Sequence, residues 1–136
     1  MKLYVKDLKL TFWNFPNDAS LLPSLKKSNN SKIINVTTDM ASQTMFANGE
    51  THPINALGYN SSKTAINALT LAFSKEFGTN GPAVFGVTPG FTTTDLNGNA
   101  PGGHTTNESA KIIIKYALSA TNYNGKILNK NGIIPW

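Results

Sequence analysis

A tyrosine and a lysine stand four positions apart in this sequence, at Tyr59 and Lys63. A phenol can give a proton to the alkoxide that forms when hydride reduces a carbonyl, but its ordinary pKa of about 10 makes it a weak acid at neutral pH. A lysine ammonium close by favours the phenolate and lowers that pKa. On a helix, this spacing places both side chains on one face, one turn apart. The pair therefore predicts proton transfer in carbonyl reduction or alcohol oxidation.

The spacing alone is not specific, because on the order of one chain in five of this size would contain it by chance. Its surroundings make it more specific. The pair opens a helical pattern, follows a β-branched run that ends in Thr37 and Thr38, and precedes an apolar run that ends in Pro89 and Gly90. The hydroxyl of Thr38, at the end of the neighbouring strand, is predicted to hold the substrate oxygen against the phenol.

Strands and helices that alternate along the chain must position these residues. The patterns predict strands at 32–37, 83–88 and 126–128, and helices at 19–27, 59–77 and 105–117. This order is typical of a parallel sheet with right-handed crossovers. A loop of about twenty residues is expected after the first strand, and a glycine-rich loop is expected before residue 105.

Two faces of the predicted helix 59–77 are expected to be buried. The face expected to lie on the sheet consists of Tyr59, Lys63, Ile66, Phe73 and Phe77. The second face, expected to contact a partner helix or subunit, consists of Ala65, Ala68 and Ala72. We therefore expect the chain to form a homo-oligomer through this helix.

The composition of the 136 residues excludes several classes of protein. Hydrophobic residues make up 40% and charged residues 14%, which is typical of one packed domain rather than of a disordered tail. The net charge of +5 comes from scattered lysines without arginine, so no nucleic-acid partner is expected. There are no cysteines, and both histidines, His52 and His104, stand in polar loops and are expected at the surface. No metal site is predicted.

Charged residues interrupt the apolar residues of the opening segment, and no stretch approaches about 18 consecutive apolar residues. A cytoplasmic location without membrane contact is therefore expected.

Four segments together resemble those of the short-chain dehydrogenases/reductases, most closely the carbonyl-reductase-like branch. The segments are, in family order, NVTT, GYNSSKTAINALTLAFSKEF, VTPGFTTTDLN and the terminal IIPW. The resemblance implies an α/β fold, namely a partial Rossmann-like parallel sheet flanked by helices that forms the carboxyl-terminal half of a doubly wound fold. Residues 19–136 would be this catalytic half, and residues 1–18 stay unassigned.

The resemblance also implies a role for each matching residue. Tyr59 would be the acid/base, and Lys63 would lower its pKa and bind the cofactor's ribose. Thr38 would take the place of the family's serine. Pro89, Gly90 and Thr94 would border the nicotinamide of NADP or NAD, and the substrate would be a small ketone, aldehyde or alcohol.

Three departures from the family pattern bear on activity. Thr38 adds a methyl group where the family has serine, and Leu10 stands where the family has a catalytic asparagine. Neither the Thr-Gly-x-x-x-Gly-x-Gly turn nor the Asn-Asn-Ala-Gly strand of the family occurs in the sequence. Because the glycine turn anchors the pyrophosphate, this chain alone is expected to bind the cofactor weakly or not at all.

Three interpretations follow and stay open. The chain is the catalytic half of an oxidoreductase that works with a companion nucleotide-binding half. Alternatively, it is a cofactor-free, inactive remnant that serves as an oligomerisation or interaction module. The third is a truncated product with no function of its own.

Overall fold

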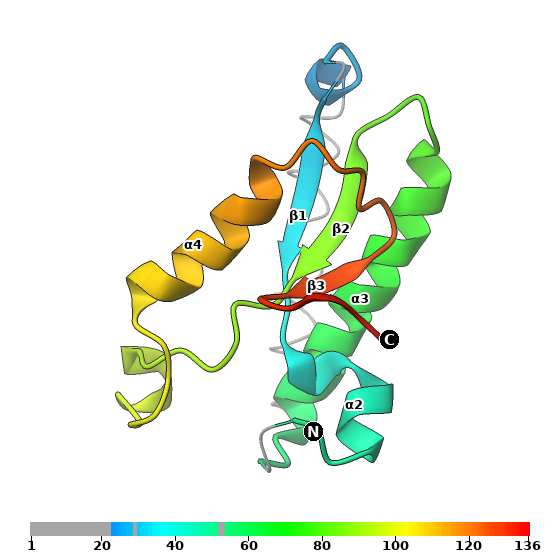
Figure 1. The fold of residues 1–136 in the computed structure, drawn as a ribbon. Helices are drawn as coiled ribbons and strands as arrows, with labels where there is room; N and C mark the ends of the chain where they lie inside the picture. The colour runs from blue at the N-terminus through cyan, green and yellow to red at the C-terminus, as the bar shows by residue number, and fades with distance from the viewer. Residues whose placement is uncertain (1–22, 29, 52–53) are drawn as a thin grey trace.

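The computed structural model describes residues 23–28, 30–51 and 54–136 (Figure 1). The predictions for residues 1–18 and for Leu10 and His52 lie outside the described residues, as do residues 19–22 of the predicted helix 19–27, of which residues 23–25 are helical. The elements are β1 (Lys32–Val36), η1 (Asp39–Ala41), α2 (Gln43–Ala47), α3 (Leu57–Phe77), β2 (Ala83–Val87), η2 (Asp95–Asn97), α4 (Thr106–Ala117), β3 (Ile127–Asn129) and β4 (Gly132–Ile134).

The sheet has the strand order β1-β2-β3-β4. β1 pairs with β2 and β2 with β3 in parallel, so the predicted α/β sheet is confirmed. β4 pairs antiparallel with β3 and was not predicted. β3 corresponds to the predicted strand 126–128, whereas β4 has only three residues, which is too short for a periodic pattern to appear in the sequence.

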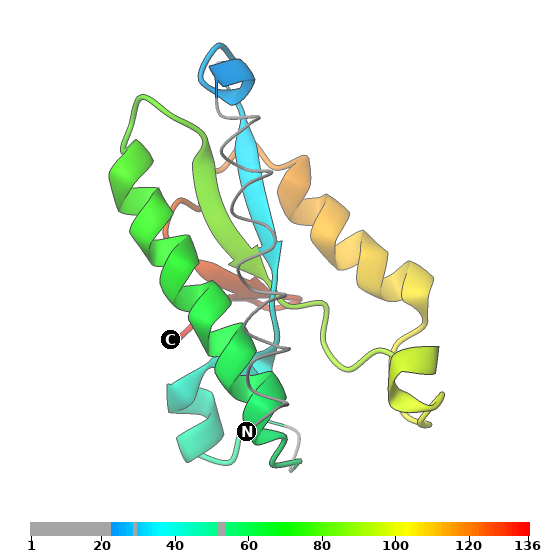
Figure 2. The ribbon, with the colours of Figure 1, turned by 180° about the vertical axis from the view of Figure 1, so that it is seen from behind.

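Helices α3 and α4 cover opposite faces of the sheet (Figures 1 and 2). The α4 face is apolar, and its core consists of Phe85, Val87, Tyr116 and Leu128. The hydroxyl of Tyr116 donates to the carbonyl oxygen of Asn129 (2.5 Å), so the one polar group of this core has a partner. Lys32 Nζ donates to the carbonyl oxygens of residues 117 and 119, at 2.8 and 2.5 Å, and thereby caps the end of α4.

The α3 face of the sheet has polar side chains among apolar ones, and the polar side chains correct the predicted orientation of the helix. The residues that α3 buries are Ser62, Asn67, Thr70 and Ser74, and not the predicted aromatic face. Asn35 Nδ2 donates to Thr70 Oγ1 (2.9 Å), and Thr37 Oγ1 donates to Asn67 Oδ1 (2.7 Å). Because the sheet presents polar side chains here, α3 turns its own small polar residues toward them.

Gly86 of β2 lets neighbouring side chains approach each other closely on the α3 face of the sheet. A Cβ added to it would lie 2.5 Å from Cδ1 of Ile127 and 3.3 Å from Cγ2 of Thr37. On the far side of α3, Ala68 and Ala72 are exposed and Ala65 is partly buried. The predicted second buried face is thus uncovered in the single chain, and self-association through it stays a prediction.

The segment after β1 is not the twenty-residue loop that was expected, because it contains η1 and α2. Ser42 explains part of the difference. Its hydroxyl accepts from the backbone N–H of Met45 (3.2 Å) and so caps α2, and it donates to the carbonyl oxygen of Pro135 (2.7 Å). Across the ranges that the structure describes, no helix has the length and apolar character that crossing a membrane requires.

Candidate active site

The carboxyl ends of β1 and β2 bring the predicted site residues to one edge of the sheet. Val36 is the register partner of Val87, so the two parallel strands end side by side. Thr38 lies two residues after the end of β1, Pro89 lies two residues after the end of β2, and Tyr59 lies in the first turn of α3. The edge where the strands end is where parallel α/β sheets bind their ligands.

Thr38, Tyr59 and Lys63 lie together at this edge, as predicted from the sequence. The side chain of Thr38 makes a hydrogen bond with that of Tyr59. Lys63 Nζ lies 5.9 Å from the centroid of the Tyr59 ring and donates to the carbonyl oxygen of Val36 (3.1 Å). Tyr59 is 40% exposed, so a ligand can reach it.

The pKa of Tyr59 departs from its expected direction. Burial raises the pKa of the Tyr59 phenol above its ordinary value, and this outweighs the lowering by the hydrogen bond with Thr38. Burial also lowers the pKa of the Lys63 ammonium. The prediction of a lowered phenol pKa is therefore wrong for the chain as it stands, because removal of the phenolate from water is the larger effect. The phenol is protonated at neutral pH and has a proton to give.

Asn67 and Thr37 form a buried polar network behind these three residues, which was not predicted. Besides accepting from Thr37, the Asn67 side chain donates through Nδ2 to the carbonyl oxygen of Ala41 (3.3 Å). Thr64 Oγ1 donates to the same carbonyl (3.2 Å). These bonds attach α3 to the chain on both sides of Thr38. The polar residues at 67, 70 and 74 have helical spacing, which could have revealed this face.

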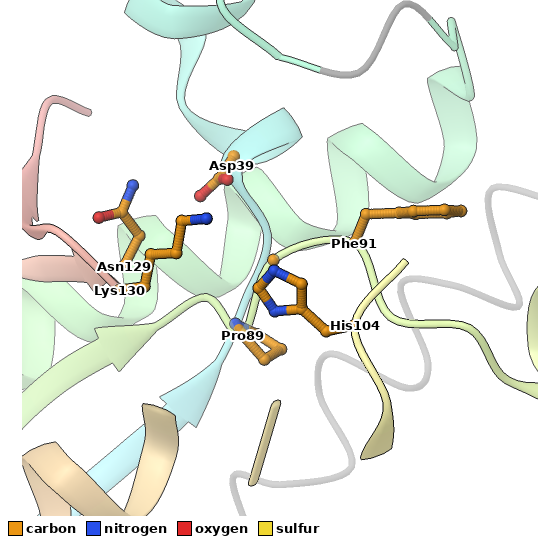
Figure 3. A pocket seen from close by; sticks show the side chains of 7 residues that line it. Asp39, Pro89, Phe91, His104, Asn129 and Lys130 are labelled. Atoms are coloured by element: carbon orange, nitrogen blue, oxygen red, sulfur yellow. The ribbon is translucent and has the colours of Figure 1, made fainter. Parts of the chain in front are cut away.

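A cavity of about 170 Å³ opens at the same edge (Figure 3). It is lined by Asp39, Pro89, Gly90, Phe91, His104, Asn129 and Lys130. Pro89 and Gly90 were predicted to border a ligand. Thr94 does not line the cavity, since it lies further along the loop, where it caps η2 and its N–H donates to Asn97 Oδ1 (3.1 Å).

His104 corrects a second prediction, because it is not a surface histidine. Its side chain is half-buried, and its Nδ1 is buried with no hydrogen-bond partner in the described part of the chain. A Cβ added to Gly90 would lie 3.5 Å from the His104 ring. The N–H of His104 donates to the carbonyl oxygen of Phe91 (2.8 Å) and its carbonyl oxygen accepts from Thr93 (3.0 Å). This backbone pairing joins the two ends of a loop, and no local sequence pattern predicts it.

Asp39 and Lys130 are the charged residues of the cavity. Burial raises the pKa of the Asp39 carboxyl above its ordinary value, and a hydrogen bond with Thr88 and the charge of Lys130 lower it. One carboxylate oxygen of Asp39, Oδ1, is buried and has no hydrogen-bond partner among the described residues. Neither residue was predicted to line a cavity, because Asp39 follows β1 and Lys130 follows β3. The sequence does not show that the ends of these two strands lie at the same cavity.

The described residues fit one end of a nicotinamide dinucleotide. Lys63 donates a hydrogen bond to the carbonyl oxygen of Val36, and an ammonium has three donors, so it can also donate to ribose hydroxyls. Pro89 and Gly90 line the cavity at the same edge of the sheet, which Thr38, Tyr59 and Lys63 do not line. Within the described ranges, no group of three or more His, Asp or Glu side chains could hold a metal ion.

Comparisons with known proteins agree with this geometry. The family model for short chain dehydrogenase matches residues 17–103. The structure of the NADPH-bound carbonyl reductase from chicken fatty liver is similar, with a TM-score of 0.75 and 27% sequence identity, and the match covers 88% of this chain and 51% of that one.

Two further solved structures share the fold at lower identity. Salutaridine reductase from Papaver somniferum has a TM-score of 0.72 and 20% identity, with 93% of this chain and 54% of that chain covered. The carbonyl reductase Sniffer of D. melanogaster has a TM-score of 0.69 and 20% identity, with 87% and 49% covered.

A search of the curated proteins finds no match. The chain spans about half the length of the solved structures it matches, and the matched half is their carboxyl-terminal part. The family model covers more than half of the chain, in agreement with the four sequence segments and the parallel sheet. The chain therefore belongs to the short-chain dehydrogenase family.

Proposed function

We propose that this chain is the proton-transferring and substrate-holding half of an NAD(P)-dependent oxidoreductase that interconverts a carbonyl and an alcohol. The observation that carries the proposal is the meeting of Thr38, Tyr59 and Lys63 at the carboxyl edge of the sheet. These side chains come from a strand end and a helix start that are 21 residues or more apart in the sequence, and together they provide a donor hydroxyl, a phenol and a cation.

Each of the three side chains has a distinct task in this mechanism. When bound, the reduced dinucleotide supplies the hydride that the carbonyl carbon accepts. The hydroxyl of Thr38 donates a hydrogen bond to the carbonyl oxygen and holds it near Tyr59. Tyr59 Oη gives its proton to that oxygen as negative charge develops there, and alcohol oxidation reverses the transfer. Lys63 Nζ stabilises the resulting phenolate and binds ribose hydroxyls.

The dinucleotide needs groups from a second, nucleotide-binding part, which we propose acts as a companion to this chain. Val36 at the outer strand β1 is 45% exposed, as expected where a further element would pack. The sequence lacks the glycine turn whose amides would meet the pyrophosphate. Loss of several charge-assisted hydrogen bonds, each worth about 1.5 to 3 kcal/mol, removes micromolar affinity. The isolated chain should bind either dinucleotide no better than about millimolar.

A second function is favoured by the exposed alanines of α3. Ala68 and Ala72 leave a smooth helix surface on which another helix can pack closely, so the chain would act as a cofactor-free oligomerisation module. This function needs neither Tyr59 nor a dinucleotide, which distinguishes it from the catalytic function.

Turnover by a Tyr59→Phe variant tests the catalytic proposal. The chain would be joined to the nucleotide-binding half of a related carbonyl reductase, and NADPH oxidation would be followed with a panel of ketones and aldehydes. Loss of the phenolic proton should abolish turnover while the far-UV circular dichroism stays unchanged. Tyr123→Phe is the matched control, because Tyr123 packs edge-on against Phe85 and Tyr116, away from the site. If Tyr59→Phe kept most of its activity, the assignment of Tyr59 as the proton donor would be wrong.

Titration calorimetry of the isolated 136-residue chain tests the need for a companion. Neither NADH nor NADPH should bind more tightly than about millimolar. Micromolar binding would show that this chain holds the dinucleotide by itself, and the companion half would then be unnecessary.

A further inference from the structure

Asparagine stands directly before glycine five times in this chain, and all five pairs lie in the described ranges. The asparagines of these pairs are Asn48, Asn80, Asn97, Asn124 and Asn131. This dipeptide is chemically labile, because the glycine nitrogen can attack the side-chain amide carbon of asparagine and glycine has no Cβ to block the approach. The attack needs a free glycine N–H and an asparagine side chain that can turn toward it. Hydrogen bonds to either group therefore determine which pair reacts.

Two of the five pairs are held by hydrogen bonds at both groups. Asn124 Oδ1 accepts from the N–H of Val84 (2.8 Å), and its Nδ2 donates to the carbonyl oxygen of Ser74 (3.0 Å). The N–H of Gly125 donates to the carbonyl oxygen of Val84 (2.8 Å). The side chain of Asn97 and the N–H of the glycine after it are held likewise, by bonds of 2.8, 3.1 and 3.1 Å to Thr92, Thr94 and Asp95. These bonds must break before either pair can react.

Two further pairs are held by local structure. Asn48 Nδ2 donates to Glu50 Oε1 (3.0 Å), and the N–H of Gly49 donates to a backbone carbonyl oxygen of α2 (3.2 Å). In the last pair of the chain, Gly132 begins β4 and is paired with Asn129 of β3. Rotation of this glycine would disturb the hairpin.

Asn80 and Gly81 differ from the other four pairs. They lie in the loop between α3 and β2, which Figure 1 shows at the end of the sheet opposite to α2. Among the described residues, neither the Asn80 side chain nor the N–H of Gly81 has a hydrogen-bond partner. Asn80 is also exposed, so water reaches its amide. In this pair the nitrogen can reach the amide carbon without the loss of a hydrogen bond to the described chain.

We propose that Asn80 is a site of spontaneous deamidation. The nitrogen of Gly81 bonds to Cγ of Asn80, and the side-chain amide takes up the proton of that nitrogen and leaves as ammonia. The product is a five-membered succinimide. Water then adds to the ring: hydrolysis of the bond to Cγ gives aspartate, and hydrolysis of the bond to the main-chain carbonyl carbon gives isoaspartate. Water is the co-reactant, and nothing is oxidised or reduced.

Both products change the end of α3. The new carboxylate lies three residues after Phe77, where the negative end of the helix dipole disfavours a further negative charge. Isoaspartate also lengthens the backbone before β2, whose first residue, Ala83, donates to the carbonyl oxygen of Ser31 (3.0 Å). The modified chain should therefore unfold at a lower urea concentration. Tyr59 lies at the other end of α3, so this inference does not depend on the proposed function.

Ageing of the chain in folded and unfolded form tests the assignment. The 136-residue chain would be kept at mildly alkaline pH with and without urea, and the change of amide to acid would be followed by mass spectrometry of its tryptic peptides. Asn80 and Asn97 share the tryptic peptide 76–111, so fragmentation of that peptide separates them. In the folded chain, Asn80 should react about tenfold faster than each of the other four, because hydrogen bonds or strand pairing must first break there.

The unfolded chain is the control for the effect of structure. In urea the five rates should lie within about threefold of one another, since no pair keeps its native bonds. If another pair reacts as fast as Asn80 in the folded chain, the assignment is wrong. If the lead of Asn80 persists in urea, the folded structure is not its cause and the inference fails.

A variant locates the isoaspartate. Asn80→Gln removes the labile pair, because the longer side chain would have to close a larger ring, which forms much more slowly. The folded variant, verified by far-UV circular dichroism, should lose most of the label that an isoaspartate-specific methyltransferase transfers to the aged parent chain. Asn107→Gln, the same change at an exposed asparagine of α4, should keep that label. Gly81→Ala is unsuitable, since its Cβ would lie 2.8 Å from Cβ of Phe77. An unchanged label in Asn80→Gln would refute the site.

Discussion

The hydrogen bond between Thr37 and Asn67 should contribute measurably to the stability of the chain. Both side chains are 3% exposed, and the two atoms Oγ1 and Oδ1 lie 2.7 Å apart. Thr37→Val keeps the shape of the side chain and removes the donor, which leaves a buried amide oxygen without a partner. The cost of such an atom is about 1 to 3 kcal/mol, and we expect the free energy of unfolding to fall by that amount.

The Asn67→Ala variant and the double variant complete a thermodynamic cycle. Asn67→Ala removes both bonds of the amide, but the carbonyl oxygen of Ala41 keeps Thr64 as a donor, so the unpaired group is the hydroxyl of Thr37. In the double variant neither group is left unpaired. Its cost should therefore be smaller than the sum of the single costs by about 1 to 2 kcal/mol.

Urea unfolding followed by far-UV circular dichroism measures all four corners of the cycle. Thr121→Val, the same substitution at an exposed position, is the control and should change the free energy of unfolding by less than about 0.5 kcal/mol. If Thr37→Val is as mild as this control, the bond is not stabilising. If the single costs simply add, the two side chains are not coupled.

Four other substitutions have predicted outcomes. Lys32→Met removes the cap at the end of α4 and should lower the free energy of unfolding by about 1 kcal/mol in urea. Thr105→Ala removes the capping box that opens α4 and should cost about the same in the same assay. Burial raises the pKa of Asp39, so the folded state holds this proton more tightly than the unfolded state does, and stability falls as pH rises above 3.8. Asp39→Asn should consequently raise Tm at pH 7 by more than at pH 4, and the opposite order would contradict the raised pKa. Light scattering of the chain should give a molar mass above that of a monomer, and Ala68→Glu should lower this mass. An unchanged mass in Ala68→Glu would show that the chain does not associate through the alanine face.

The site residues that were predicted from the sequence are those whose positions follow from their immediate neighbours in the chain. Tyr59 and Lys63 share a helix turn, and Thr38 directly follows a β-branched strand, so sequence spacing alone places each of them on its element. Parallel pairing of the two strands then brings them to one edge. The same reasoning placed Pro89 and Gly90 at the end of β2.

The parts that were missed depend on contacts between distant segments. His104 was predicted at the surface, because only its pairing with Phe91 and Thr93 turns its ring toward the cavity. Asp39 and Lys130 are 91 positions apart and acquire a joint role only through the sheet. The buried face of α3 was predicted incorrectly, because it was assigned from the hydrophobic residues of the helix. The sheet has polar side chains there, and these bind polar residues of α3.

The polar layer between α3 and the sheet also determines how these two elements can move. The interface of α4 is mainly apolar, and its hydrogen bonds, made by Tyr116 and Lys32, lie at the carboxyl-terminal end of that helix. Hydrogen bonds have preferred lengths and directions, so α3 cannot rotate or shift along β1 without breaking the bonds of Asn67 and Thr70 together. The separation of Thr38 and Tyr59 should therefore stay constant unless these bonds break.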